Sequence, residues 1–222
     1  ILKPPKGYLE GVREICDEHG IMMVCDEVMV GFGRSGKLFG WCHADVVPDL
    51  FTGAKGINGA YLPLGVVGMR DKLAQHFREH PTNIGSTYNS HPVSVASAYA
   101  ALQYMLENEV IQNAANLEPL MIERLQRLVD NHASVKQARV IGLFGCFDLQ
   151  KNLNGDFNRL VSDPLKDEMI EFKSKLIENG VLTMMRGHNV FTNPPLIINA
   201  DEINQAFDGI EKALPILDAV VE

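Results

Sequence analysis

Two apolar segments that end in charged residues constrain the fold of this chain most strongly. Residues 21–25 lead directly into Asp26 and Glu27, and residues 50–54 lead directly into Lys55. The first segment shows no alternation of apolar and polar residues, a pattern that is typical of a parallel strand buried on both faces. We therefore expect an acid and an amine at the ends of two buried strands. Such an arrangement can hold the two ends of a cofactor ring.

The composition limits the class of protein and the kind of partner. The 222 residues are 46% hydrophobic and 22% charged, the balance of a globular protein, and they suffice for one large domain or somewhat more. The net charge of −8 argues against a nucleic-acid partner, because phosphate binding needs a basic face. No apolar run approaches the ~20 residues of a membrane span. We therefore expect neither a nucleic-acid nor a membrane partner.

Cysteine and histidine spacing predicts neither a disulfide framework nor a metal site. The four cysteines (Cys16, Cys25, Cys42 and Cys146) form no CxxC pair, and the seven histidines lack metal-ligand spacing. A reducing, cytoplasmic compartment fits this pattern. Residues 1–7 have neither the charged start nor the apolar stretch of a signal peptide. The chain lacks an initiator Met and begins with what reads as mid-domain sequence, so we expect a piece of a longer protein.

Periodicity and turn residues divide the chain into elements. Helices are predicted for residues 8–19, 70–80, 113–132, 166–179 and 200–221, with another long helix that begins at Pro92 and is capped by Ser90 or His91. Strands are predicted for residues 21–25, 50–54, 65–69, 139–149, 181–185, 190–192 and 196–198, and a polar loop for residues 151–163. We expect an α/β domain over residues 1–110 and a smaller α+β domain over residues 111–222.

Five motifs then identify a family by their order and spacing. They are Cys25-Asp26-Glu27-Val28 leading into the Gly-rich residues 31–36; Pro48-Asp49 leading to Ala54-Lys55-Gly56; Tyr61-Leu62-Pro63-Leu64-Gly65; Gly85-Ser86-Thr87-Tyr88; and Met185-Arg186 followed by Asn193-Pro194-Pro195-Leu196. Together they resemble the second half of a class III (omega) aminotransferase, a pyridoxal-phosphate-dependent transferase of fold type I. The resemblance implies that residues 1–110 are the later part of the cofactor-binding large domain, which contains a mixed sheet.

Two departures from the family pattern accompany the resemblance. Ser35 stands where the family more often has Thr. Family members are also longer, and the half outside this chain would carry the Gly-Ser phosphate-binding loop and the aromatic residue that stacks on the cofactor. Residues 61–64 are similar to the branch that acts on beta-alanine, taurine and related omega-amines, with pyruvate as the acceptor.

The resemblance assigns a role to each residue near the two strand ends. Lys55 would bind pyridoxal phosphate as a Schiff base and then move a proton between the substrate and the cofactor. Asp26 would keep the pyridine nitrogen protonated, and Val28 would pack against one face of the ring. Glu27 resembles the family's second acid near the lysine, for which we expect a supporting role.

Three further residues are implied outside those strand ends. Thr87 resembles the residue that donates a hydroxyl to the cofactor phosphate of the neighbouring subunit, and the adjacent Ser86 is a weaker candidate. A contact that crosses between subunits implies a homodimer with shared active sites. Arg186 resembles the mobile arginine that binds a substrate carboxylate. A guanidinium suits this role, because it can form two parallel hydrogen bonds with a carboxylate.

The predicted activity is transfer of an amino group from an omega-amino acid or amine to a keto acid, with pyruvate as the expected acceptor. The same Asp and Lys also serve other pyridoxal-phosphate reactions, such as decarboxylation or aminomutation. A catalytically incomplete fragment is a third reading. A nucleotide-binding domain is disfavoured, because residues 31–36 lack the strand–Gly-x-Gly-x-x-Gly–helix form.

Overall fold

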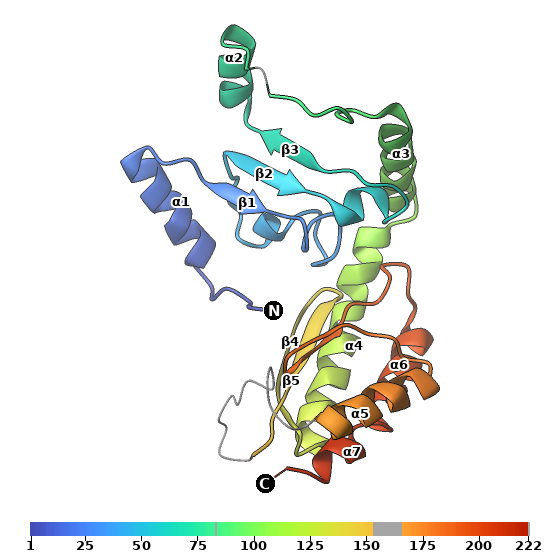
Figure 1. Ribbon diagram of the computed structural model, residues 1–222. Helices are drawn as coiled ribbons and strands as arrows, with labels where there is room; N and C mark the ends of the chain where they lie inside the picture. Colours follow the sequence, from blue (N-terminus) through green and yellow to red (C-terminus); the bar gives the residue numbers. More distant parts are fainter. Residues whose placement is uncertain (83, 153–165, 222) are drawn as a thin grey trace. The chain divides into compact units, whose positions relative to one another are not determined.

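The computed structural model describes residues 1–82, 84–152 and 166–221. It divides into two compact units, Pro4–Ala114 and Ala115–Glu222, the second of which also includes Ile1–Lys3. Figure 1 shows the elements of each unit, and each is described by itself. The division lies within the long helix α4 (Val110–Asn131), and the domain boundary predicted at residue 110 falls at the start of that helix.

The first unit is built on a three-stranded mixed sheet with the order β1-β2-β3. Strand β1 (Val24–Asp26) runs parallel to β2 (Leu50–Gly53), and β3 (Val66–Met69) runs antiparallel to β2. The other elements are the α-helices α1 (Tyr8–His19), α2 (Asp71–Glu79) and α3 (Pro92–Glu107), and the 3₁₀ helices η1 (Gly40–His43) and η2 (Lys55–Asn58). The mixed sheet expected for this part of the chain is confirmed.

Helix α1 has the bounds that the sequence predicted, and it ends at Gly20, which adopts the left-handed conformation with φ of 64°. Its Cys16 joins Met23, Trp41 and Val46 in a buried apolar cluster. Helix α3 begins at Pro92 with His91 at the N-cap position, but no side chain caps it. Pro at the first position needs no N–H partner, so the helix can begin there.

Strand β1 corrects the expectation of burial on both faces. Cys25 packs against the apolar cluster and is half-buried, whereas Val24 is 58% exposed and Asp26 is exposed. Successive side chains of a strand point to opposite faces, so one face of β1 is covered and the other is open. The strand is also shorter than predicted and begins at Val24. Asp26 therefore lies on the open face.

The second unit contains a four-stranded antiparallel sheet with the order β4-β5-β7-β6. Its strands are β4 (Val135–Ile141), β5 (Phe144–Leu149), β6 (Met185–Arg186) and β7 (Asn189–Thr192), and its helices are α4, α5 (Lys166–Glu178), α6 (Ala200–Glu211) and α7 (Pro215–Asp218). The core includes the fully buried side chains of Leu125, Leu128, Phe147, Phe172, Leu176, Val190, Ile203 and Leu214. The predicted α+β composition is confirmed for this unit.

Several predicted bounds in the second unit are wrong for identifiable reasons. The single strand predicted over 139–149 is a hairpin of β4 and β5, because the chain turns at Gly142, where φ is 58°. The helix predicted over 200–221 is two helices, since Pro215 begins a new one. Residues 181–184 and 196–198 form no strand. Apart from Lys151 and Asn152, the predicted loop 151–163 lies outside the described residues.

Candidate functional site

The acid and the amine singled out in the sequence come from the same edge of the first sheet. Strands β1 and β2 are parallel, with Asp26 opposite Thr52. The ladder continues one step further, since the Glu27 N–H donates to the Thr52 carbonyl at 2.8 Å. Lys55 begins η2 shortly after β2 ends. The carboxyl ends of neighbouring parallel strands share one edge, and this is where ligands bind in open α/β sheets.

The backbone of Lys55 is held in an unusual conformation. Its φ is 45°, in the left-handed region that costs a non-glycine residue about 1–2 kcal/mol. The packing around η2 keeps it there. A Cβ on Gly56 would lie 3.0 Å from the Cβ of Phe32, so the loop and the turn are in close contact. Strained positions of this kind, held by their surroundings, cluster at functional sites.

Asn58 anchors the same turn on α3. It is 1% exposed, donates to the Leu62 carbonyl at 2.9 Å, and accepts from the Ser97 hydroxyl at 2.6 Å. Because a buried amide is costly to leave unbonded, these contacts favour a single position for η2. The Lys55 side chain thus begins from a fixed point.

The charges of Lys55 and Asp26 are both available to a ligand. Among the described residues, no carboxylate lies within ion-pair distance of the Lys55 amine, which contacts the thioether of Met29. Asp26 forms no ion pair in this part of the chain, and its Oδ1 accepts from the Val28 N–H at 3.0 Å. Both side chains are exposed, and Val28 beside them is half-buried. An unpaired amine, an unpaired carboxylate and an apolar side chain fit an aldehyde-bearing, cationic aromatic ring.

Glu27 has a structural task at the end of β1. It is 3% exposed, and its carboxylate accepts from the backbone N–H groups of Gly40 at 2.8 Å and Trp41 at 3.3 Å. Burial raises the pKa of Glu27, while the two N–H donors act against this rise. Glu27 therefore connects the end of β1 to the first turn of η1. Its side chain shapes the loop between them.

The structure does not bring Thr87 or Ser86 to this edge within one chain. Both are exposed in the turn that precedes α3, where the Ser86 carbonyl accepts from the Asn89 N–H at 3.0 Å. In the described part of the chain, no hydrogen bond joins either residue to Asp26 or Lys55. Their predicted contact with a cofactor of the neighbouring subunit stays a prediction.

Arg186 lies in the second unit, on the two-residue edge strand β6, and its side chain is exposed. It pairs with Asn189 of β7, and Asn189 donates in turn to the carboxylate of Asp148. Asp148 is 2% exposed and also binds the guanidinium of Arg139 through both oxygens, at 2.5 and 2.8 Å. Sequence reasoning missed this cluster, whose only local signal was an acid inside an apolar segment.

Burial alone would raise the pKa of Asp148, but hydrogen bonds from Arg139, Gln137 and Asn189 hold it below its usual range. The carboxylate is therefore ionised and fixed at neutral pH. Its hydrogen bonds connect β4, β5 and β7. The β6–β7 hairpin is thus anchored at Asn189, next to its turn, while the guanidinium of Arg186 stays exposed.

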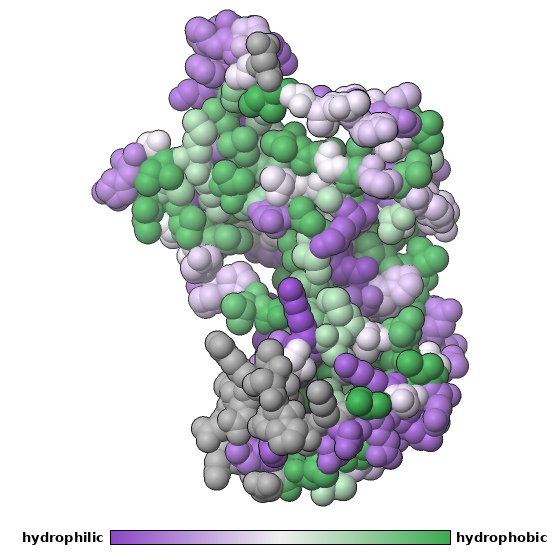
Figure 2. Space-filling view, viewed as in Figure 1, coloured by the Kyte–Doolittle hydropathy of each residue, from purple (hydrophilic) through white to green (hydrophobic). Residues whose placement is uncertain are grey.

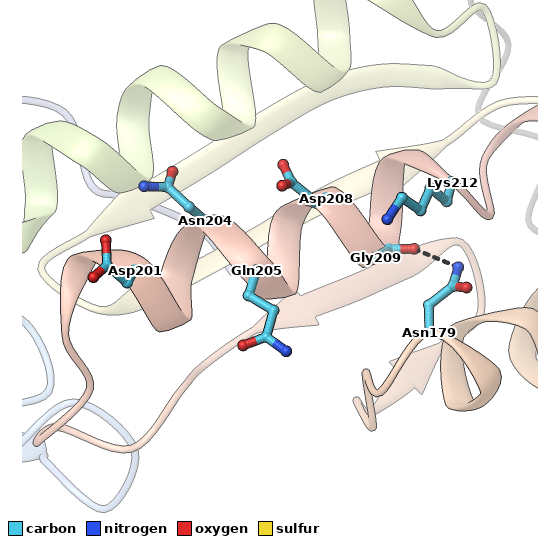
Figure 3. Close-up of a pocket in the computed structure, with 7 residues that line it drawn as sticks. All are labelled: Asn179, Asp201, Asn204, Gln205, Asp208, Gly209 and Lys212. Atoms are coloured by element: carbon cyan, nitrogen blue, oxygen red, sulfur yellow. Dashed lines mark hydrogen bonds between the residues drawn. The ribbon is translucent and has the colours of Figure 1, made fainter.

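A cavity in the second unit lies apart from the predicted site residues (Figure 3). It has a volume of about 360 Å³ and is lined by Asn179, Asp201, Asn204, Gln205, Asp208, Gly209 and Lys212. Six of these residues lie on or next to α6, and Asn179 follows α5, donating to the Gly209 carbonyl at 2.9 Å. No residue singled out in the sequence lines this cavity.

The described residues contain no group of three or more His, Cys, Asp or Glu side chains that could hold a metal ion. None of the helices described is long and apolar enough to cross a membrane. All four cysteines are free thiols.

Comparison with known proteins then identifies the family. The sequence model described as Aminotransferase class-III matches residues 1–214. The chain is 31% identical over 223 residues to an omega-aminotransferase of Caulobacter vibrioides, and 30% identical over 213 residues to ornithine aminotransferase 1 of Staphylococcus aureus. The matches cover 98% and 94% of this chain but 48% and 49% of the relatives. The chain therefore spans about half the length of these curated proteins.

Solved structures show the same relationship in three dimensions. A taurine:2-oxoglutarate aminotransferase from Bifidobacterium kashiwanohense, in complex with PLP and glutamate, superposes on the whole chain with a TM-score of 0.93 and 37% identity, over 50% of its own length. An S-selective transaminase from Bacillus megaterium matches 97% of the chain with a TM-score of 0.89 and 28% identity, over 48% of its own length. The fold is that of a fold type I transferase, and this chain belongs to the class III aminotransferases.

Proposed function

We propose that the protein that contains this chain is a pyridoxal-phosphate-dependent aminotransferase. It would move an amino group from an omega-amino acid or amine to a keto acid. The observation that carries this proposal is the meeting of Asp26 and Lys55 at one edge of two parallel strands in a class III family member. Since the chain spans about half of its relatives, the activity belongs to the whole protein.

Each residue at this edge would bind a different part of the cofactor. Pyridoxal phosphate supplies an aldehyde that takes up amines and a protonated ring that withdraws electrons from the bound substrate. Lys55 would hold the aldehyde carbon through its Nζ, and Asp26 would hold the proton on the ring nitrogen. Val28 would pack against the ring. The unpaired state of both charges in the described residues supports this division.

Lys55 would also act as the proton carrier. Once its Nζ is released by an incoming amine, it can take a proton from the substrate carbon and deliver it to the cofactor. The fixed backbone at η2 supports this role, because the amine swings from a defined point rather than from a mobile loop. Positioning of this kind lowers the entropy cost of proton transfer.

We further propose a homodimer in which Thr87, with Ser86 beside it, reaches the cofactor phosphate of the neighbouring subunit. The exposure of both side chains and their lack of hydrogen bonds to Asp26 or Lys55 in the described chain support a contact across subunits. A phosphate accepts hydrogen bonds from hydroxyl and backbone N–H groups, which this turn can supply.

Arg186 would select substrates that carry a carboxylate. Its exposed guanidinium on an anchored hairpin suits bidentate binding of a carboxylate, and it can turn away when the amine donor has none. The motif at residues 61–64 favours pyruvate as the acceptor. The likeness to a taurine:2-oxoglutarate aminotransferase makes 2-oxoglutarate the second acceptor to test.

The test is amine-dependent formation of an amino acid by the purified full-length protein with pyridoxal phosphate. Taurine, beta-alanine and ornithine would be offered in turn, each with pyruvate and with 2-oxoglutarate. Alanine or glutamate that appears only when the amine is present supports the proposal. Release of carbon dioxide, or an amino group shifted within one substrate, would instead assign decarboxylase or aminomutase chemistry. No product with any pair would overturn the proposal.

A further inference from the structure

The register of β1 on β2 is only partly specified by apolar packing. The strand has three residues, and Cys25 shares the covered face with Met23, the residue just before the strand. Burial of these two side chains opposes a slip of one residue, which would turn both to the other face, but not a slip of two residues, which keeps side chains on their face. Yet this register places Asp26 opposite Thr52. Another contact must therefore hold the strand.

Asp49 supplies that contact at the start of β1. Its Oδ2 accepts from the Met23 N–H at 2.8 Å, while the N–H groups of Asp49 and Leu50 donate to the Met23 carbonyl at 2.9 and 3.2 Å. Both backbone groups of Met23 are thus bound to the start of β2. The backbone of β2 binds only the Met23 carbonyl, and the Asp49 carboxylate adds the acceptor for the Met23 N–H.

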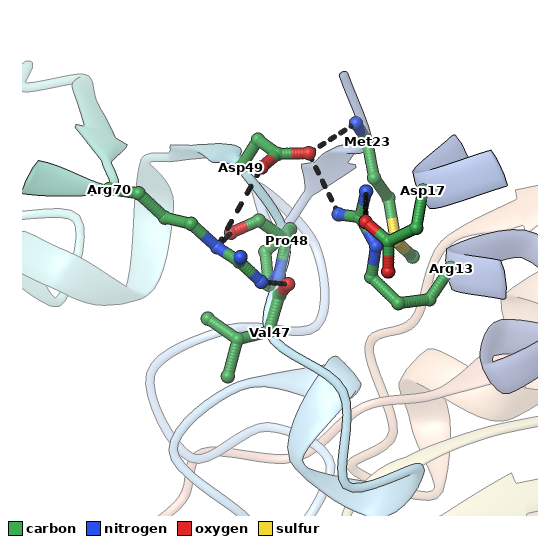
Figure 4. Close-up of polar contacts among 7 residues, drawn as sticks. All are labelled: Arg13, Asp17, Met23, Val47, Pro48, Asp49 and Arg70. Atoms are coloured by element: carbon green, nitrogen blue, oxygen red, sulfur yellow. Dashed lines mark hydrogen bonds and ion pairs between the residues drawn. The ribbon is translucent and has the colours of Figure 1, made fainter. Parts of the chain in front are cut away.

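Asp49 is itself held from two sides, as Figure 4 shows. Arg13 of α1 donates to Oδ2 at 2.7 Å, and Arg70, which follows β3, approaches Oδ1 to 3.7 Å. Arg70 also donates to the Pro48 carbonyl at 3.1 Å. Burial would raise the pKa of Asp49, but the hydrogen bonds from Arg13 and Met23 lower it below the ordinary value. The carboxylate is therefore charged and fixed between the two arginines.

We propose that Asp49 is a positioning residue that sets the register of β1 on β2, and thereby the place of the Asp26 carboxylate relative to the Lys55 amine. A slip of two residues, which burial does not oppose, would move Asp26 by about 6.6 Å along the strand and keep its side chain on the same face. Asp49 lies at the far end of the strands from Asp26 and Lys55, so it touches neither reacting group. This inference rests on the proposed function for its catalytic consequence, but not for its structural one.

The experiment compares Asp49→Ala with Asp49→Asn in the full-length protein. Asparagine keeps an oxygen that can accept from the Met23 N–H and loses only the charge, whereas alanine loses both. Asp17→Ala is the matched control, because Asp17 also pairs with Arg13, at 2.8 Å, but is 67% exposed and bonds to no strand through its side chain. Asp49→Ala and Asp17→Ala thus each remove one of the two carboxylates that pair with Arg13.

The first readout is hydrogen exchange of residues 23–28, which needs no cofactor chemistry. Exchange in Asp49→Ala is expected to accelerate by about 5- to 150-fold, the factor for a buried N–H left without its acceptor. Asp49→Asn is expected to lie between Asp49→Ala and wild type, and Asp17→Ala to match wild type. Unchanged exchange in Asp49→Ala would overturn the register claim, whether or not the protein is an aminotransferase.

The second readout is the turnover per bound cofactor, together with the pH dependence of the cofactor absorbance. A misplacement on the order of 1 Å costs about 100-fold in rate, so Asp49→Ala is expected to lose about that factor in kcat and to shift the absorbance midpoint. A residue that only stabilised the fold would lower the melting temperature and leave both quantities unchanged per bound cofactor. That outcome, or an equal loss in Asp49→Asn and Asp49→Ala, would overturn the positioning role.

Arg13→Gln covers the case in which Asp49→Ala does not fold. It frees the Asp49 carboxylate without removing it, so exchange of residues 23–28 should accelerate relative to Asp17→Ala. No acceleration would contradict the inference. If the wild-type protein forms no amino product, the proposed function fails, and the exchange measurements still decide whether Asp49 sets the register.

Discussion

The two sheets of this chain are stabilised in different ways. In the second unit, all six residues of β5 are buried, and side chains such as Phe172 and Leu176 of α5 are fully buried in the same unit. In the first unit, β1 is three residues long and leaves Val24 58% exposed. The buried sheet specifies its register through burial. The open sheet depends on individual polar groups, Asp49 at the start of β1 and Glu27 at its end.

In this chain, which spans about half the length of its relatives, the strand end proposed to receive the ligand has few apolar contacts on its open face. Hydrogen bonds to two carboxylates, the half-buried Asp49 and the buried Glu27, hold this strand. Such bonds contribute little net stability on average, but they are costly to break and strongly directional. Substitutions at the strand ends of the first sheet should therefore change chemistry more than stability, and substitutions in the buried core of the second unit should do the reverse.

The largest effect is expected for Lys55→Ala. Turnover should fall by at least about 10⁴-fold, because no other group of the site can replace the amine as proton carrier. The melting temperature should stay the same, since Lys55 is exposed and forms no ion pair among the described residues. Lys72→Ala, an exposed lysine on α2, is the control and should keep wild-type turnover. A loss of less than about 100-fold in Lys55→Ala would contradict the assignment.

Asp26→Asn is expected to lower kcat by about 10²- to 10³-fold, the cost of removing one preorganised electrostatic group. The amide keeps the shape of the carboxylate but cannot hold the ring proton by charge. Asp17→Asn serves as the control at an exposed position. Single-turnover reaction with an amine donor measures the step directly. A loss below threefold would exclude Asp26 as the partner of the ring nitrogen.

Leu176→Ala tests the second unit. The side chain is 1% exposed in the core, and its truncation should destabilise the unit by about 2–5 kcal/mol. The neighbouring Ile177 is 62% exposed, so Ile177→Ala should change stability by no more than about 0.5 kcal/mol. Denaturant unfolding measures both. Similar costs at the two positions would contradict the burial of Leu176 in the core of this unit.

Arg186→Ala should separate two kinds of substrate. The kcat/KM for carboxylate-bearing substrates should fall by about 10- to 100-fold, which corresponds to the loss of charged hydrogen bonds. Simple amines should react at nearly the wild-type rate. Arg186→Lys should restore part of the loss, because it keeps the charge without the planar fork. Equal losses for both kinds of substrate would remove the carboxylate role.

The smallest effect is expected for the pH dependence of Asp148. Its folded-state pKa is lowered by Arg139, Gln137 and Asn189 despite burial. Its contribution to stability is therefore fully present above the unfolded-state pKa of about 3.9 and is lost as pH falls through the lower folded-state value. Asp148→Asn should be less stable than wild type near pH 7, and the difference should shrink in acid. Urea unfolding between pH 7 and pH 3 measures it, and a constant difference would contradict this account.

Local signals in the sequence predicted much of the fold. Helix α1 was found with its predicted bounds, because an apolar period is followed by Gly20. The features that failed depend on single breaking residues or on tertiary covering. Pro215 divides the last helix and Gly142 turns the predicted strand into a hairpin. The open face of β1 could not be predicted, because strand composition does not say which elements cover a sheet.

The placement of the candidate site residues could be predicted where it depends on strand ends, and not where it depends on long-range partners. The meeting of Asp26 and Lys55 at one edge follows from two apolar segments in a parallel arrangement. The role of Asp49 does not, because its partners Arg13 and Met23 lie 36 and 26 positions away in the sequence. Such contacts become visible only when the chain is folded.

Covalent trapping tests the central claim most directly. The full-length protein would be loaded with pyridoxal phosphate and reduced with borohydride, which converts a carbon–nitrogen double bond into a stable amine. After digestion, mass spectrometry locates the added pyridoxyl group. The account predicts the label on the peptide that contains Lys55, and no label there in Lys55→Ala. A wild-type protein that carries no label, or carries it on another residue such as Lys37 or Lys72, would contradict the account.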